Sequence, residues 1–174
     1  MSTHEAGNAD VVRPRLVVFD LDGVLADVAH RVHHVTGGRR DWDAFFAAAP
    51  ADPVHAAGRA LLVDLIGEGR VAAYLTGRPE RCRADTLAWL AEHGLPAGPL
   101  LMRPAADRRP ARLVKAEALA HLARDNDIDL VVDDDPEVVA TLRSRGFTVH
   151  HALWGRPDDV GVVLSAIQQE QGRT

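Results

Sequence analysis

Short apolar runs that lead directly into polar residues restrict the fold of this chain more than any other feature. Residues 16–19 are apolar throughout and are followed at once by Asp20-Leu21-Asp22-Gly23. A strand buried on both faces of a parallel sheet has this uninterrupted apolar pattern. Comparable runs occupy residues 71–75, 100–102 and 128–132, and residues 147–149 are a candidate fifth strand.

Helical patterns separate these runs. The first is predicted over residues 53–66, where Asp52-Pro53 has the residue types of an N-cap and a first turn. Further helices are expected to begin at Pro79, Pro110 and Pro136. Strands that alternate with helices predict an α/β fold with a doubly wound parallel sheet.

Length and composition indicate a globular protein. The chain has 174 residues, of which 47% are hydrophobic and 26% charged, so we expect a single domain over residues 15–174 after a flexible arm over residues 1–14. No apolar run approaches the ~18 residues of a membrane span, and the start has no signal-peptide core, which favours a cytoplasmic location. The only cysteine, Cys82, excludes a disulfide framework and a cysteine-rich zinc site. A net charge of −5 gives no general attraction to nucleic acid, so any such contact must be local.

Polar residues follow the predicted strands at the edge where an open α/β sheet binds its ligand. This group is expected to converge on one crevice, and it consists of Asp20, Asp22, Thr76, Arg78, Arg103, Asp133 and Asp134. Lys115, the only lysine of the chain, lies near the start of the next helix and can join them. Four carboxylates so close together cannot all stay ionised without a cation, and ligands that are all oxygen favour Mg²⁺.

These residue types suit the hydrolysis of a phosphate ester. A carboxylate can attack phosphorus and form an aspartyl-phosphate, and Asp20 is placed for that role. Asp22 can then protonate the leaving alcohol and deprotonate the attacking water. Thr76 offers a hydroxyl to the phosphoryl oxygens, and Lys115 supplies a compact positive charge.

The same segments resemble the four-motif signature of the haloacid dehalogenase (HAD) superfamily. They are Asp20-Leu21-Asp22-Gly23-Val24-Leu25, Thr76-Gly77-Arg78, Lys115 and Asp133-Asp134, in that order. The resemblance implies a HAD-like, Rossmannoid phosphatase fold with Asp20 as nucleophile and Asp22 as general acid and base. It also implies Mg²⁺ ligands from Asp20, the backbone carbonyl of Asp22 and Asp133, with Asp134 as a ligand or its support.

A closer similarity is to the phosphatase domain of bacteriophage polynucleotide kinase/phosphatase. It rests on Leu101-Met102-Arg103, Asp107, Arg109 and Val114-Lys115, and it implies substrate contacts from Gly77, Arg78, Arg31, Arg103 and Arg109. One departure is Ala111, where that family tends to carry an aspartate. The only lysine follows Val114, so the chain contains no phosphate loop of the Gly-Lys-Ser/Thr type and encodes no 5′-kinase.

The segment over residues 24–51 is predicted to be a small cap with one short helix over residues 39–46. A small cap leaves the crevice open, which favours a large substrate such as the end of a polynucleotide. Trp42, Phe45 and Phe46 could stack on a base, but local packing is the favoured interpretation.

The leading hypothesis is therefore a Mg²⁺-dependent phosphomonoesterase that acts on DNA or RNA 3′-phosphate ends or on nucleotides. A small-molecule phosphatase or nucleotidase on the same scaffold remains an alternative. A non-enzymatic phospho-acceptor domain is a third hypothesis, although receiver domains carry their acidic pair first and their acceptor aspartate in mid-chain. The sequence leaves the oligomeric state open.

Overall fold

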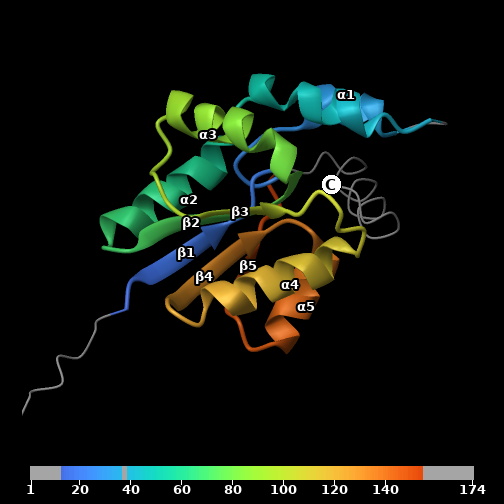
Figure 1. The fold of residues 1–174 in the computed structure, drawn as a ribbon. Helices are drawn as coiled ribbons and strands as arrows, with labels where there is room; N and C mark the ends of the chain where they lie inside the picture. Colours follow the sequence, from blue (N-terminus) through green and yellow to red (C-terminus); the bar gives the residue numbers. More distant parts are fainter. Residues whose placement is uncertain (1–12, 37–38, 155–174) are drawn as a thin grey trace, which may run out of the picture.

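The computed structural model describes residues 13–36 and 39–154, and it contains a five-stranded parallel sheet (Figure 1). The order of the strands is β3-β2-β1-β4-β5, with β1 in the centre. Their bounds are β1 Arg15–Phe19, β2 Val71–Pro79, β3 Leu100–Arg103, β4 Asp127–Asp133 and β5 Val149–His151. The expectations for the arm over residues 1–12 and for the domain beyond residue 154 lie outside the described residues.

Helices cover both faces of the sheet, as a doubly wound fold requires. In Figure 1, α2 (Ala56–Gly67) and α3 (Arg83–Glu92) lie on one face, and α4 (Ala111–Leu122) and α5 (Pro136–Ser144) lie on the other. The predicted α/β architecture is confirmed. Among the described residues, no helix has the length and hydropathy that crossing a bilayer requires.

The central strand β1 shows why its sequence is apolar throughout. Val17 and Phe19 pack with residues of α2 and α3, whereas Leu16 and Val18 pack with residues of α4 and α5. All four side chains are buried because alternate residues of a strand point to opposite faces and both faces are covered.

Several predicted boundaries were wrong. The helix expected from residue 53 begins at Ala56, because Val54 forms a β-bridge with Ala26 and the segment before it is extended. Pro79 ends β2 and does not begin a helix; a short 3₁₀ helix, η3 (Glu80–Cys82), leads into α3. The fifth strand lies two residues later than expected.

Residues 24–51, which we call the insert, connect β1 to α2. They contain η1 (Ala29–His34), α1 (Trp42–Ala47) and η2 (Ala49–Ala51), and residues 37–38 lie outside the described part. The predicted short helix is α1, capped by Asp41, whose side chain accepts a hydrogen bond from the backbone of Ala44. Trp42, Phe45 and Phe46 are buried and pack on one another, which confirms local packing as their role.

Candidate active site

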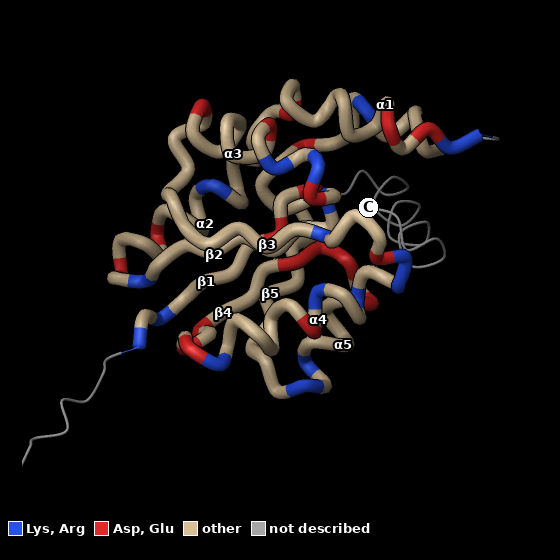
Figure 2. Tube along the Cα trace, viewed as in Figure 1, with Lys and Arg blue, Asp and Glu red and all other residues tan. Residues whose placement is uncertain are grey.

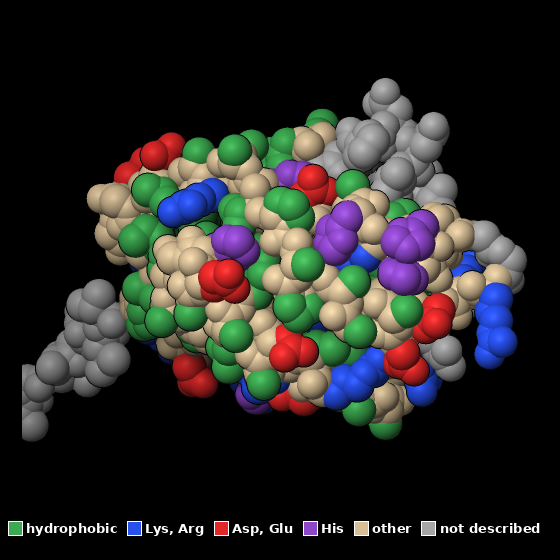
Figure 3. All heavy atoms as spheres, turned by 90° about the horizontal axis from the view of Figure 1, so that it is seen from above, with side chains coloured by type: hydrophobic (Ala, Val, Ile, Leu, Met, Phe, Trp, Pro, Cys, Tyr) green, Lys and Arg blue, Asp and Glu red, His purple; other side chains and the backbone are tan. Residues whose placement is uncertain are grey.

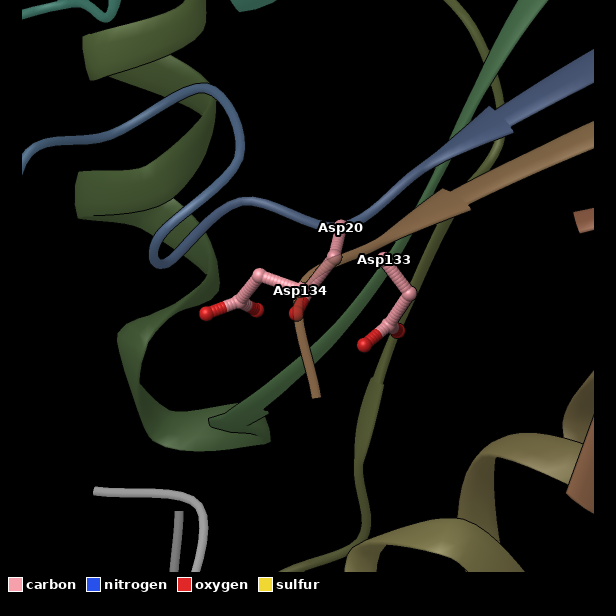
Figure 4. A group of neighbouring side chains, drawn as sticks. All are labelled: Asp20, Asp133 and Asp134. Carbon is pink, nitrogen blue, oxygen red and sulfur yellow. The ribbon is translucent and has the colours of Figure 1, made fainter. Parts of the chain in front are cut away.

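Charged residues of both signs gather beyond the carboxyl ends of the strands (Figure 2). Asp20 directly follows β1, and Asp133 is the last residue of β4, so two neighbouring strands place their carboxylates side by side. Asp134 follows, and one oxygen of each of the three carboxylates lies within 4.8 Å of the others (Figure 4). This convergence matches the expectation from the sequence.

Lys115 enters this cluster from α4. Its Nζ donates hydrogen bonds to Oδ2 of Asp20 at 2.6 Å and to Oδ2 of Asp133 at 2.7 Å, and the residue is only 4% exposed. The backbone N–H of Leu21 donates to the other oxygen of Asp20 at 2.8 Å. Both oxygens of the Asp20 carboxylate therefore accept a hydrogen bond, which fixes the orientation of the group.

The three carboxylates of the cluster carry more negative charge than the single ammonium of Lys115 can neutralise. Burial raises the pKa of Asp20 to about 7, although Lys115 acts in the opposite direction. Burial and the neighbouring carboxylates of Asp133 and Asp20 also hold the pKa of Asp134 well above its usual range. Burial opposes the charge of Lys115, but Asp133 and Asp20 outweigh it and raise the pKa of the ammonium. Three oxygen donors with this surplus of negative charge fit a hard divalent cation such as Mg²⁺.

The turn after β1 depends on Gly23. Its φ of 82° lies in the left-handed region, which side chains other than glycine's rarely allow. A Cβ at this position would lie 2.3 Å from Oδ2 of Asp134. Glycine thus lets the backbone of the Asp20–Asp22 segment approach the carboxylate of Asp134.

Asp22 lies beside a pair of buried arginines. Its Oδ1 accepts hydrogen bonds from Nη2 of Arg31 at 2.7 Å and from Nε and Nη2 of Arg78 at 2.8 and 2.6 Å. Burial opposes ionisation of Asp22, but the two guanidinium groups outweigh it and lower the pKa to about 2. The structure therefore brings the predicted Arg31 and Arg78 together at one carboxylate, which is 12% exposed.

Strand β2 carries the Thr76-Gly77-Arg78 segment and continues through it to Pro79. Thr76 is buried, and its hydroxyl accepts a hydrogen bond from the backbone of Arg78 at 3.2 Å. Gly77 is half-buried in the same extended segment. The strand thereby directs the guanidinium of Arg78 toward Asp22.

The other two predicted substrate arginines lie in different surroundings. Arg103 is buried and donates to the backbone carbonyl of Arg109 at 2.9 Å, so it supports the loop after β3. Arg109 pairs with Asp107 and Glu117 at the surface. Arg103 also lines a cavity of about 210 Å³ between the insert and this loop, together with Arg81, Arg108, Trp42 and Phe46.

Asp52 is the site residue that the sequence analysis missed, because it was interpreted as a helix cap. Its carboxylate is buried and accepts hydrogen bonds from both Arg31 and Arg78. The sequence carried no signal for this role, because Arg31 and Arg78 were expected to contact the substrate and their convergence on Asp22 and Asp52 depends on the fold.

The surface beside the insert has no single charge character. In Figure 3, basic and acidic side chains are interspersed with hydrophobic ones, and histidines occur at several separate places. The acidic trio of Asp20, Asp133 and Asp134 is the one potential metal cluster within residues 13–36 and 39–154.

Comparisons with known proteins identify the family of this chain. A family model described as the polynucleotide kinase PNKP phosphatase domain matches residues 14–155. Two structures of a Pnkp1/Rnl/Hen1 RNA repair complex contain chains that are 24% and 25% identical, each with a TM-score of 0.69 over 82% of this chain. This chain covers 43% and 46% of those chains, less than half of their length.

A class C acid phosphatase from Bacillus anthracis is 16% identical, with a TM-score of 0.60 over 82% of this chain and 68% of its own, and shares the fold. A search of curated proteins gave no match. Since the family model covers most of the residues, including every strand and helix described above, this chain belongs to the PNKP phosphatase domains of the HAD superfamily.

Proposed function

We propose that the protein is a Mg²⁺-dependent phosphomonoesterase that works through an aspartyl-phosphate on Asp20 and removes 3′-phosphates from nucleic-acid ends. The observation that carries this proposal is that two carboxylates close together in the sequence have different partners. Asp20 contacts a buried lysine within an acidic cluster, whereas Asp22, two residues later, contacts two arginines.

In the first step, a carboxylate oxygen of Asp20 attacks phosphorus while the bond from phosphorus to the leaving oxygen breaks. The backbone N–H of Leu21 and the ammonium of Lys115 hold this carboxylate in one orientation. A fixed orientation lowers the entropic part of the barrier, and Lys115 lies close enough to balance negative charge on the transferred group.

Asp22 transfers a proton in each of the two steps. Because Arg31 and Arg78 keep Asp22 ionised, it first takes the proton of a monoprotonated phosphoryl group and passes it to the leaving oxygen. In the second step it takes a proton from the water that attacks the aspartyl-phosphate and passes it to the released phosphate, which regenerates Asp20 and the ionised Asp22. Arg31 and Arg78 share one oxygen of Asp22, and its other oxygen accepts from neither of them. That second oxygen is the candidate for the proton transfer.

Asp20, Asp133, Asp134 and the backbone carbonyl of Asp22 are the groups that would hold Mg²⁺. When bound, the cation neutralises phosphoryl oxygens and keeps the clustered carboxylates ionised. Lys115 and the turn at Gly23 keep these carboxylates close together whether or not a cation is bound.

A nucleic-acid end is favoured as substrate by two features. The matching family is that of a polynucleotide kinase, and similar chains occur in an RNA repair complex. In addition, Arg81, Arg103 and Arg108 line the cavity between the insert and the loop after β3, which would allow local contacts with a phosphate backbone.

The test is a phosphatase screen of the purified protein with Mg²⁺ and with EDTA. The substrates are DNA and RNA oligonucleotides with 3′- or 5′-phosphates, free mononucleotides and sugar phosphates. We expect Mg²⁺-dependent release of phosphate, fastest from 3′-phosphorylated ends, and a loss of about 10⁴-fold in Asp20→Asn.

Other outcomes would contradict specific parts of the proposal. A strong preference for free mononucleotides or sugar phosphates would reject the polynucleotide substrate. Stoichiometric phosphorylation without turnover would reject the enzyme in favour of a phospho-acceptor domain. Full activity of Asp20→Asn would reject the nucleophile.

A further inference from the structure

Asp52 lies where the insert returns to the core, and its carboxylate is fully buried. Its Oδ1 accepts from Nε of Arg31 at 2.7 Å and contacts Nε2 of His30 at 2.8 Å. Its Oδ2 accepts from Nη2 of Arg31 and Nη2 of Arg78, both at 2.7 Å. The contact with Arg31 is therefore bidentate, the strongest geometry of an arginine–carboxylate pair.

The two arginines come from separate parts of the chain. Arg31 belongs to η1 of the insert and Arg78 to the end of β2, and both are fully buried. Each touches Asp52 on one side and Oδ1 of Asp22 on the other. Two like charges at this depth repel each other strongly unless anions lie between them, and Asp22 alone supplies only one.

The backbone of Asp52 is fixed as well. Its carbonyl accepts a hydrogen bond from Nε1 of Trp89 in α3 at 2.8 Å, and its N–H donates to the carbonyl of Ala49. The ring of Trp89 also lies 5.7 Å from the guanidinium carbon of Arg78. Asp52 is thus held by the core while its side chain holds the arginines.

We propose that Asp52 is a positioning residue, which acts through Arg31 and Arg78 to orient Asp22 for proton transfer to the leaving alcohol. This inference rests on the proposed function. It adds a group that does not touch the substrate: Asp52 aligns the two arginines, and the arginines fix one oxygen of Asp22 so that the other faces the reacting phosphate ester.

A positioning role for Asp52 predicts that the effect of a substitution depends on the leaving group of the substrate. The chosen variant, Asp52→Asn, keeps the shape of the side chain but places an amide N–H₂ where an acceptor is needed. An alkyl alcohol needs a proton as it departs, whereas p-nitrophenolate is stable without one. Misplacing Asp22 should therefore slow an alkyl phosphate much more than p-nitrophenyl phosphate.

The experiment compares kcat/KM for a 3′-phosphorylated oligonucleotide, for a 3′-mononucleotide and for p-nitrophenyl phosphate, all with Mg²⁺. In Asp52→Asn we expect a loss of about 100-fold on the two alkyl esters and less than about 10-fold on p-nitrophenyl phosphate. The ratio between substrates does not depend on how much of the preparation is folded, so a loss of stability alone cannot produce it.

The matched control is Asp129→Asn. Asp129 also pairs with two arginines, Arg15 and Arg70, but it lies in β4 near the opposite end of the strands. This variant should keep wild-type rates on all three substrates. Arg78→Lys is measured in parallel because it keeps the charge but loses the planar fork whose Nε and Nη2 both donate to Asp22 while Nη2 also donates to Asp52, and it should reproduce the leaving-group signature.

Equal losses on all substrates in both Asp52→Asn and Arg78→Lys, or no loss in either, would overturn the positioning role. Failure of the proposed function is visible separately, since the wild-type protein would then hydrolyse none of the esters. A wild-type protein that accepts the mononucleotide but not the oligonucleotide would correct the substrate and leave the test of Asp52 intact.

Discussion

At the scale of single residues, the buried ammonium of Lys115 is held between two carboxylates of the site. It bridges Asp20 and Asp133 from α4, where a bulky guanidinium would have to displace one of them. We expect Lys115→Arg to lower kcat by about 100-fold or more while the protein remains folded. Steady-state kinetics and circular dichroism measure the two effects.

The control for this substitution exchanges the same two residue types in reverse. Arg112→Lys changes a partly exposed side chain of the same helix, where the guanidinium lies 4.0 Å from Glu137. It should leave kcat unchanged. Wild-type turnover in Lys115→Arg would remove Lys115 from the catalytic machinery.

Asp22 gives the protein a specific sensitivity to acid. Its pKa is lowered from 3.8 to about 2 in the folded protein, since Arg31 and Arg78 outweigh the effect of burial. A lowered pKa means that the ionised carboxylate stabilises the fold above pH 4 and that this stabilisation is lost as the pH falls toward 2. The shift corresponds to about 2 kcal/mol of unfolding free energy.

Urea unfolding at pH 5 and near pH 2.5 measures this contribution. The wild-type protein should lose more stability over that interval than Asp22→Asn, which has no titrating group at this position. Parallel losses in the two proteins would show that the arginine pair does not stabilise the ionised form.

At the scale of elements, α2 is fixed against the active-site turn by a contact between backbones. A Cβ on Gly58 would lie 2.1 Å from the carbonyl oxygen of Val24 in the segment after β1. We expect Gly58→Ala to lower the unfolding free energy by about 1–3 kcal/mol, because the helix must move away from that carbonyl. Chemical denaturation measures the change.

Gly67 provides the matched control at the other end of the same helix. A Cβ there would meet no atom within 4 Å. Gly67→Ala should be neutral or stabilise the protein by up to about 1 kcal/mol through helix propensity. Equal effects of the two substitutions would mean that the close approach of α2 does not exist in solution.

The elements also show how far sequence patterns predict this fold. The buried strands were predictable because an uninterrupted apolar run has few other uses. Pro136 correctly marked the start of α5, where the structure shows Asp135 as the N-cap. The start of α2 was not predictable from Asp52-Pro53. A local cap and a distant pair of arginines compete for the same carboxylate, and the sequence shows only the local option.

At the scale of the whole molecule, the parallel sheet explains why the acidic cluster was predictable. Every strand ends at the same edge, so residues that follow β1 and β4 must meet there, whatever the loops do. The positions of the arginines cannot be predicted from the sheet in this way. Arg103 and Arg109 differ in burial and partners because the loop after β3 sets their positions.

The three clustered carboxylates predict that the stability of the protein rises when a divalent cation binds. Asp20, Asp133 and Asp134 repel one another, and a bound Mg²⁺ would relieve the repulsion only in the folded protein. At 100 times its dissociation constant, a ligand stabilises a fold by about 2.7 kcal/mol, which for this size corresponds to a rise in Tm of several degrees. EDTA should remove that rise.

The effect should depend on pH in a defined direction. The pKa of Asp20 is raised to about 7 by burial, so below pH 7 protons compete with Mg²⁺ for this carboxylate. Thermal denaturation should therefore show a larger Mg²⁺-induced rise in Tm at pH 8 than at pH 5.5. Asp133→Asn should lose most of the rise, whereas Asp129→Asn, outside the cluster, should keep it. An undiminished rise in Asp133→Asn would place the cation elsewhere and separate metal binding from the carboxylates that the sheet brings together.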